Sequence, residues 1–343
     1  MRPRTVRPPA AARLRRWVER FPGRRAVVWG DFVLDEYWRC RSRRVSREAP
    51  VLVLDYQDRT VQGGGAANAA LNLAALGACV AAVGWVGADA AGHELRRLLE
   101  RAGVDTLGLL EHDDAPTVVK TRVVAGSVHT ARQQVVRVDR GAPFRVAGRA
   151  RAALLEAAAQ AATGTDAVVL SDYGYDSVTP GLARRAVRAW RRAGVVVGLD
   201  ARYRLAAYRD VSLATPNEGE AAAAAGLEVR DEADLARAAT RLVKRLRVPH
   251  LIVTRGRDGL TLWDARGGVS LEAWGGEEAV DVTGAGDAVV AVATLALAAG
   301  ARALEAAALA NVAGSVAVSR RGAVAVTRAE LARALRRDPR GAR

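Results

Sequence analysis

Short apolar runs alternate with alanine- and arginine-rich stretches along most of the 343 residues. The runs that we predict to be strands are Ala26–Trp29, Val80–Val83, Ala167–Leu170, Val195–Leu199 and Leu251–Thr254. Intervening stretches such as Ala66–Leu76 and Gly92–Ala102 have the length and composition of helices. Strands that alternate with helices form parallel sheets, because each crossover helix packs back onto a face of the sheet. The pattern therefore predicts an α/β fold with helices on both faces of a mostly parallel sheet.

Two regions depart from this alternation, residues 37–62 and 116–140. In the second, Val118–Val123 and Gln134–Val138 resemble the two strands of a hairpin. Paired strands outside the main sheet predict a small lid, and its free edges favour a homodimer formed through the lid. The predicted organisation is a basic arm with a short helix (1–22), a single domain (23–335) and a tail (336–343).

Composition excludes several classes of protein. The net charge is +15, but lysine occurs only twice and the arginines are scattered rather than gathered with aromatic residues, so no nucleic-acid partner is expected. An anionic small-molecule substrate fits the charge equally well. No 20-residue apolar run or signal-peptide core occurs, which predicts a soluble cytoplasmic protein without a membrane partner. Cys40 and Cys79 have no metal-like or redox-like spacing, so neither a disulfide framework nor a zinc site is expected.

A glycine-rich segment, Asp-Val-Thr-Gly-Ala-Gly-Asp at residues 281–287, leads directly into an apolar stretch. Its three small residues are Gly284, Ala285 and Gly286. At the start of a helix, their amides can approach an anion, and the helix dipole favours negative charge there. The same positive end is expected to keep Asp287 ionised, so that it can accept a proton from an attacking hydroxyl. The alternative is an ordinary helix start capped by Thr283 or Asp281.

A second group of polar residues lies near the N-terminus. Asp31 and Asp35 follow the first predicted strand, and residues 63–65, all glycine, precede Asn68 at a predicted helix start. Ligands of doubly wound sheets bind outside the carboxyl ends of the strands. Carboxylates and amides hold sugar hydroxyls well, since a hydroxyl both donates and accepts hydrogen bonds. The alternative is a flexible glycine turn before an ordinary helix start. The phosphate-loop, dinucleotide-fingerprint, zinc-protease and hydrolase-elbow motifs do not occur in the sequence.

The combination of Gly64–Asn68 with Asp281–Asp287, in that order and about 215 residues apart, resembles the ribokinase-like, or PfkB, carbohydrate kinases. The resemblance implies a three-layer α/β sandwich with a β-strand lid, an ATP-dependent sugar kinase, and ATP with Mg²⁺ as cofactors. By this resemblance, residues 284–286 form an anion hole. The implied nucleotide-site residues are Asn217, Glu220, Thr254, Gly256, Gly259 and Asn311. The implied metal ligands are Asn217 and Glu220 for Mg²⁺, with Asp281 and Thr283 for a monovalent cation such as K⁺.

Longer segments, including residues 30–38, 45–51 and 170–173, resemble the heptose 7-phosphate kinases of ADP-heptose synthesis. That likeness implies phosphorylation of the anomeric hydroxyl of D-glycero-D-manno-heptose 7-phosphate to the 1,7-bisphosphate. The implied substrate-binding residues are Asp31, Asp35, Gly64, Gly65, Asn68, Lys120, Arg122, Asp172 and Arg202. Since the sequence ends shortly after the kinase pattern, we expect a monofunctional protein without the cytidylyltransferase-like domain of some heptose enzymes.

Two departures from the heptose kinase pattern bear on the substrate. Tyr175 and Arg202 lie in segments where those kinases carry lysines. A guanidinium differs from an ammonium in geometry, and a tyrosine removes the charge. The alternatives are therefore a PfkB kinase for another sugar or a nucleoside, and a sugar- or nucleotide-binding regulator without catalysis. The presence of Asp287 and Glu220 argues against the regulator.

Overall fold

The computed structural model describes residues 3–126, 133–144, 147–275 and 279–337. Most of the predicted tail (336–343), part of the second lid segment and the first two residues lie outside this range.

The main sheet has ten strands in the order β1-β14-β13-β12-β11-β10-β9-β2-β5-β6. All neighbouring strands pair in parallel except β13, which runs antiparallel to both β12 and β14. The strands are β1 (Arg4–Thr5), β2 (Arg25–Gly30), β5 (Cys79–Gly87), β6 (Asp105–His112), β9 (Ala167–Asp172), β10 (Val196–Ala201), β11 (Leu213–Ala214), β12 (His250–Thr254), β13 (Leu260–Asp264) and β14 (Gly267–Leu271). The mostly parallel sheet predicted from the alternation is confirmed.

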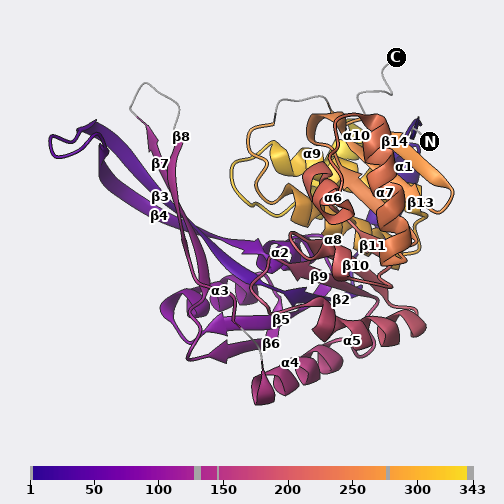
Figure 1. Ribbon diagram of the computed structural model, residues 1–343, viewed down its shortest axis with the longest axis horizontal. Coiled ribbons are helices and arrows are strands. Elements are labelled where there is room, and N and C mark those ends of the chain that lie inside the picture. The colour runs from indigo at the N-terminus through magenta and orange to yellow at the C-terminus, as the bar shows by residue number, and fades with distance from the viewer. Residues whose placement is uncertain (1–2, 127–132, 145–146, 276–278, 338–343) are drawn as a thin grey trace.

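Helices cover both faces of this sheet and produce two separate apolar cores. The helices that contribute buried residues to the first core are α1 (Ala11–Val18), α2 (Ala66–Ala75), α3 (Ala90–Arg101), α8 (Ala285–Ala298), α9 (Ala303–Val318) and α10 (Arg328–Arg336). Those that contribute to the second are α4 (Gly148–Ala161), α5 (Pro180–Arg192), α6 (Glu218–Ala225) and α7 (Glu232–Leu246). The result is the expected three-layer sandwich (Figure 1).

A second sheet, of four strands in the order β4-β3-β7-β8, projects away from this body (Figure 1). Its strands are β3 (Phe32–Val45), β4 (Leu52–Gly65), β7 (Val118–Gly126) and β8 (Gln133–Arg140). It contains the lid segments predicted around 37–62 and 116–140. Strand β3 begins earlier than predicted, only two residues after β2 ends, and β4 leads directly into α2. The glycines at 63–65 are therefore the paired end of a strand and not a free turn.

The N-terminal segment is part of the folded body. Strand β1 pairs with β14 at the edge of the main sheet, and Leu14 and Val18 of α1 are buried in the first core. Helix α8 is apolar around most of its circumference, which explains its position between the sheet and α9. Among the described residues, no helix combines the length and the apolar character needed to cross a bilayer.

Candidate active site

Helix α8 begins at the wall of a cavity of about 1320 Å³. Gly284 caps the helix with φ +78°, a backbone conformation that favours glycine, and a Cβ there would lie 2.4 Å from Nδ2 of Asn68. Gly284, Ala285 and Gly286 line the cavity, as expected for an anion site. One of the three backbone amides already has a hydrogen-bond partner, since Ala285 N–H donates to the Val282 carbonyl over 3.3 Å.

Asp287 lies in the first turn of α8, with only 3 % of its surface exposed. The Asn68 amide donates to its Oδ2 over 2.8 Å, and the Tyr173 hydroxyl donates to its Oδ1 over 2.9 Å. We expected the helix dipole to keep this carboxylate ionised. Instead, burial raises its pKa to about 7, and the two hydrogen bonds offset only part of that effect. Near neutral pH, Asp287 is therefore able both to accept and to release a proton.

Asp35 approaches the same cavity from strand β3. It is buried, its Oδ1 accepts a hydrogen bond from Arg122 over 2.7 Å, and burial raises its pKa against the effect of that guanidinium. A Cβ on Gly64, in the neighbouring strand, would lie 2.6 Å from Asp35 Oδ2. The glycine is therefore needed for the close approach of this carboxylate to β4.

The cations of the second sheet that line the cavity already have anionic partners. Lys120 Nζ lies 3.5 Å from Asp139 Oδ2 and donates to the Tyr175 hydroxyl over 3.1 Å. Arg137 forms two hydrogen bonds with the carboxylate of Asp139. An anionic ligand at this wall competes with these internal contacts.

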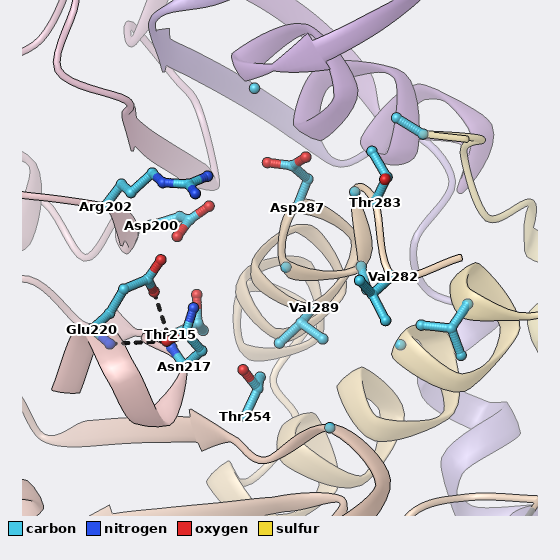
Figure 2. Close-up of a pocket in the computed structure, with 18 of the residues that line it drawn as sticks. Asp200, Arg202, Thr215, Asn217, Glu220, Thr254, Val282, Thr283, Asp287 and Val289 are labelled. Carbon is cyan, nitrogen blue, oxygen red and sulfur yellow. Dashed lines mark hydrogen bonds between the residues drawn. The ribbon is translucent and has the colours of Figure 1, made fainter. Parts of the chain in front are cut away.

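Three polar groups face Asp287 across the cavity (Figure 2). They are Asp200 and Arg202, at and just after the end of β10, and Glu220 on α6. Burial raises the pKa of Asp200, and the negative charges of Asp287 and Glu220 add to that effect. A cation bound between these carboxylates would relieve their repulsion.

The start of α6 is closed by a reciprocal pair of hydrogen bonds. The Asn217 side chain accepts from the Glu220 backbone N–H over 2.8 Å, and Glu220 Oε2 accepts from the Asn217 N–H over 3.0 Å. Both residues line the cavity and leave further oxygen lone pairs for Mg²⁺ or its water shell.

The proposed monovalent-cation residues lie on a different loop. Asp281 Oδ1 accepts from the Thr283 N–H over 2.9 Å, and Oδ2 accepts from the Gly322 N–H over 2.8 Å. Of the two predicted ligands, Thr283 lines the cavity. Within the described ranges, His, Cys, Asp and Glu side chains do not gather in threes at any one point as a preformed metal site.

Comparison with known proteins identifies the family. Residues 25–329 match the profile of the pfkB family carbohydrate kinases. This chain belongs to that family. A PfkB kinase is an ATP-dependent carbohydrate kinase, and the recognition made from the motifs is confirmed.

Curated relatives of this PfkB kinase include two proteins named "Bifunctional protein HldE". The protein from Citrifermentans bemidjiense is 38 % identical over 314 residues, which cover 91 % of this chain and 63 % of the relative. The protein from Geobacter metallireducens is 39 % identical over 307 residues, which cover 89 % and 62 %. The kinase thus spans somewhat less than two thirds of the length of these relatives.

Solved structures share the fold. Arabidopsis thaliana ribokinase, complexed with ribose and ATP, superimposes with a TM-score of 0.71 at 21 % identity and covers 91 % of this chain and 99 % of its own. Escherichia coli phosphofructokinase-2 in complex with fructose-6-phosphate gives 0.74 at 21 % identity, with 92 % and 99 % covered. These likenesses confirm the ribokinase-like sandwich predicted for this kinase.

The structure brings most of the predicted site residues to one cavity. Those that line it are Asp35, Gly65, Lys120, Arg122, Arg202, Asn217, Glu220, Thr254, Gly256, Gly259, Thr283, Gly284, Ala285, Gly286, Asp287 and Asn311. Five others are not among the described lining residues of this PfkB kinase: Asp31, Gly64, Asn68, Asp172 and Asp281. Asn68 and Gly64 nevertheless contact Asp287 and Asp35 directly, so they act one layer behind the cavity wall.

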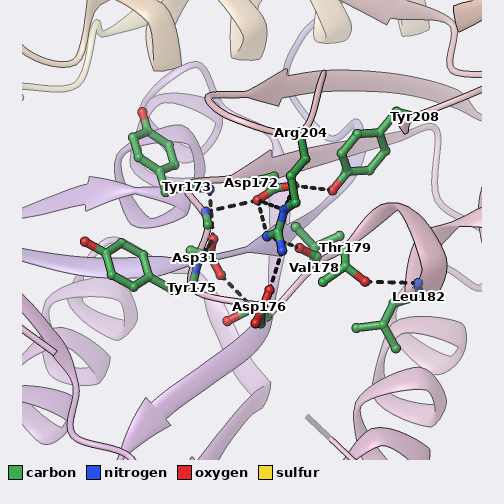
Figure 3. Close-up of polar contacts among 12 residues, drawn as sticks. Asp31, Asp172, Tyr173, Tyr175, Asp176, Val178, Thr179, Leu182, Arg204 and Tyr208 are labelled. Atoms are coloured by element: carbon green, nitrogen blue, oxygen red, sulfur yellow. Dashed lines mark hydrogen bonds and ion pairs between the residues drawn. The ribbon is translucent and has the colours of Figure 1, made fainter. Parts of the chain in front are cut away.

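Asp31 and Asp172 were expected to bind the sugar, and the structure gives both a different role (Figure 3). The carboxylate of Asp31 accepts hydrogen bonds from the backbone amides of Tyr173, Tyr175 and Ser177, at 2.8, 3.0 and 2.9 Å. Asp172 is fully buried and accepts from Arg204 Nε over 2.9 Å. Their oxygens hold the loop after β9 in place, because each faces protein donors rather than the cavity.

Among the cavity residues of this PfkB kinase that sequence reasoning did not assign to the site are Tyr173, Tyr175 and Asp200. Each lies at or just after the carboxyl end of β9 or β10, which are neighbours of each other, and β9 also neighbours β2. The rule that ligands bind at such strand ends would have found them.

Proposed function

We propose that this chain transfers the γ-phosphoryl group of ATP to the anomeric hydroxyl of D-glycero-D-manno-heptose 7-phosphate, producing the 1,7-bisphosphate. The observation that carries the kinase chemistry is the position of Asp287, buried at the N-terminal end of α8 and facing a large cavity. The choice of a heptose rests on the sequence segments that resemble heptose kinases and on the similarity to the HldE proteins.

In this mechanism, Asp287 accepts the proton of the sugar hydroxyl. The hydroxyl oxygen forms a bond to the γ-phosphorus as the bond from that phosphorus to the ADP oxygen breaks. A pKa of about 7 suits the transfer, because the base is substantially ionised at neutral pH and still binds the proton well. The amides at the start of α8 stabilise the charge on the transferring group.

Nucleotide and metal occupy the other end of the cavity in this proposal. Thr254, Gly256, Gly259 and Asn311 line the part assigned to ATP. Asn217 and Glu220 would hold Mg²⁺ through water, and the ion would supply positive charge to the phosphates. Their oxygens fit that role, since hard cations prefer carboxylate and amide ligands. We also propose a monovalent-cation site near Asp281 and Thr283; a solved phosphofructokinase-2 from Escherichia coli is a complex with potassium.

We further propose that the second sheet closes over the sugar as a lid and pairs with a second copy of the chain. Several of its apolar side chains are exposed, among them Trp38, Tyr56, Val136 and Val138. Its outer strands β4 and β8 leave backbone groups available for another strand. We propose a cytoplasmic location, because ATP and sugar phosphates are the substrates of the proposed reaction. The proposal includes neither a nucleic-acid partner nor a membrane partner.

A screen of ATP consumption over sugars, sugar phosphates and nucleosides tests this function. Turnover with heptose 7-phosphate at least tenfold above that with unphosphorylated heptose supports the proposal. Preference for a neutral sugar or a nucleoside would replace it with another PfkB activity. Ligand binding without any turnover would favour a non-catalytic sugar or nucleotide sensor.

A further inference from the structure

We propose that Tyr173 is a positioning residue that keeps the carboxylate of Asp287 in its proton-accepting form and aims it at the cavity. This inference deepens the proposed function and rests on it. Its first support is contact: the Tyr173 hydroxyl donates to Asp287 Oδ1 over 2.9 Å, and Tyr173 itself lines the cavity. A donor to a carboxylate favours the ionised form, so losing that hydrogen bond favours protonation.

The second support is the rigidity of the loop that carries Tyr173. Asp31 accepts hydrogen bonds from three backbone N–H groups of this loop, including that of Tyr173, and is 1 % exposed (Figure 3). Arg204 forms ion pairs with Asp172, immediately before Tyr173, and with Asp176, which has φ +71°. A loop that only connected β9 to α5 would not need two buried carboxylates, Asp31 and Asp172, to hold it in one conformation. They fix the place of the tyrosine hydroxyl.

The third support is the balance of charges around the base. Asp35 and Asp200 both oppose ionisation of Asp287, and Arg202 favours it. Among the described residues, the Asn68 amide and the Tyr173 hydroxyl are the side chains with a hydrogen bond to Asp287 that favours the ionised form. Each carboxylate oxygen of Asp287 has two acceptor positions, so Tyr173 can remain bonded while a sugar hydroxyl donates its proton.

Tyr173→Phe tests the inference, with Tyr208→Phe as the matched control. Tyr208 is also buried and its hydroxyl donates to a different carboxylate, that of Asp172, over 2.7 Å. We expect Tyr173→Phe to move the acidic limb of the kcat profile to higher pH by about one unit. Turnover at pH 6.5 should then fall about eightfold, with less than a twofold loss at pH 9. In the control, Asp172 keeps its ion pair with Arg204, so the loop stays in place and the position of the limb should not change.

A measurement without substrates separates this inference from the proposed function. The ¹³C signal of the Asp287 carboxyl, identified by its loss in Asp287→Asn, should titrate at higher pH in Tyr173→Phe than in the wild type. If the wild type phosphorylates no sugar, the proposed function fails, and this titration still decides the role of Tyr173. An unchanged titration, or a variant that changes only the KM for the sugar, would show that Tyr173 packs against the ligand and would overturn the proposal.

Discussion

The side-chain amide of Asn68 donates to Oδ2 of Asp287 over 2.8 Å and to the carbonyl of Gly284 over 3.2 Å. Two signatures that lie far apart in the sequence thus meet through one side chain. Asn68 comes from α2 and Asp287 from α8, and these helices pack against each other on one face of the main sheet. The segment near the N-terminus that we propose to bind the sugar therefore also contacts the start of α8.

The first prediction follows from this contact. Asn68→Ala removes a donor from a buried carboxylate, so we expect kcat near neutral pH to fall about tenfold, with an unchanged KM for ATP. Sequence analysis alone would have predicted a change mainly in sugar binding. Steady-state kinetics with each substrate varied in turn checks the result. A defect limited to ATP binding would contradict the geometry.

The second prediction concerns the base itself. Asp287→Asn cannot accept the proton, so turnover should fall by about 100-fold or more while ATP and the sugar still bind. Initial rates and equilibrium dialysis with ATP measure the two effects separately. A kcat within a few-fold of the wild type would remove Asp287 from its assigned role.

The third prediction uses the same variant to measure stability against pH. The pKa of Asp287 is about 7 in the folded chain, against 3.8 as the ordinary value, which we take for the unfolded chain. The stability that this group contributes is therefore fully present below about pH 4, where it is protonated, and is lost as the pH rises through 7. Asn imitates the protonated form, so Asp287→Asn should be more stable than the wild type by an amount on the order of 4 kcal/mol at pH 8. The difference should shrink at pH 5. Urea unfolding at both values checks this, and an equal difference at both would refute it.

The fourth prediction addresses recognition of a phosphate already on the sugar. Arg202→Ala should raise the KM for heptose 7-phosphate ten- to a hundred-fold, roughly 1.5–3 kcal/mol, and leave that for a neutral heptose nearly unchanged. Arg122→Ala is a poorer test than the sequence suggested, because it also deprives buried Asp35 of its guanidinium partner. Equal effects of Arg202→Ala on both sugars would argue against a phosphate contact.

The fifth prediction concerns the loop after β9. Arg204→Ala leaves the fully buried Asp172 without its ion pair, so the free energy of unfolding should fall by about 3 kcal/mol. Arg188→Ala is the matched control, since its pair with Asp210 is partly exposed and Asp210 keeps Arg247 as a partner. That change should cost less than about 0.5 kcal/mol. Chemical denaturation gives both values, and similar losses would contradict the assignment.

The parts of the fold that sequence predicts well are those with strong local patterns. Strand β2 is apolar from Ala26 to Trp29 and was placed within one residue at each end, because a buried parallel strand has few polar positions. The outer strand β6 was missed, since its residues alternate between buried and exposed and include charged ones. The start of β3 was placed too late, because Phe32–Asp35 reads locally as a loop after β2.

The site shows the same division between local and long-range information. The motif residues at 284–287 reach the cavity, because a glycine-rich helix start is specified within a few positions. The true partners of Asp31 lie about 140 residues away on the loop after β9, and no local pattern indicates them. Tyr173 was missed as a site residue for the same reason, since its contact with Asp287 depends on how separate parts of the chain meet.

Strand β3 runs from the cavity wall at Asp35 to the tip of the second sheet, so that the two form parts of a single lever. Strand β3 runs from Phe32 to Val45, and at a rise of about 3.3 Å per residue its length is about 45 Å. A rotation of about ten degrees at the Phe32 end would therefore move the far end by about 8 Å. Asp35 lies close to that pivot, so the same rotation would displace its carboxylate by only about 2 Å.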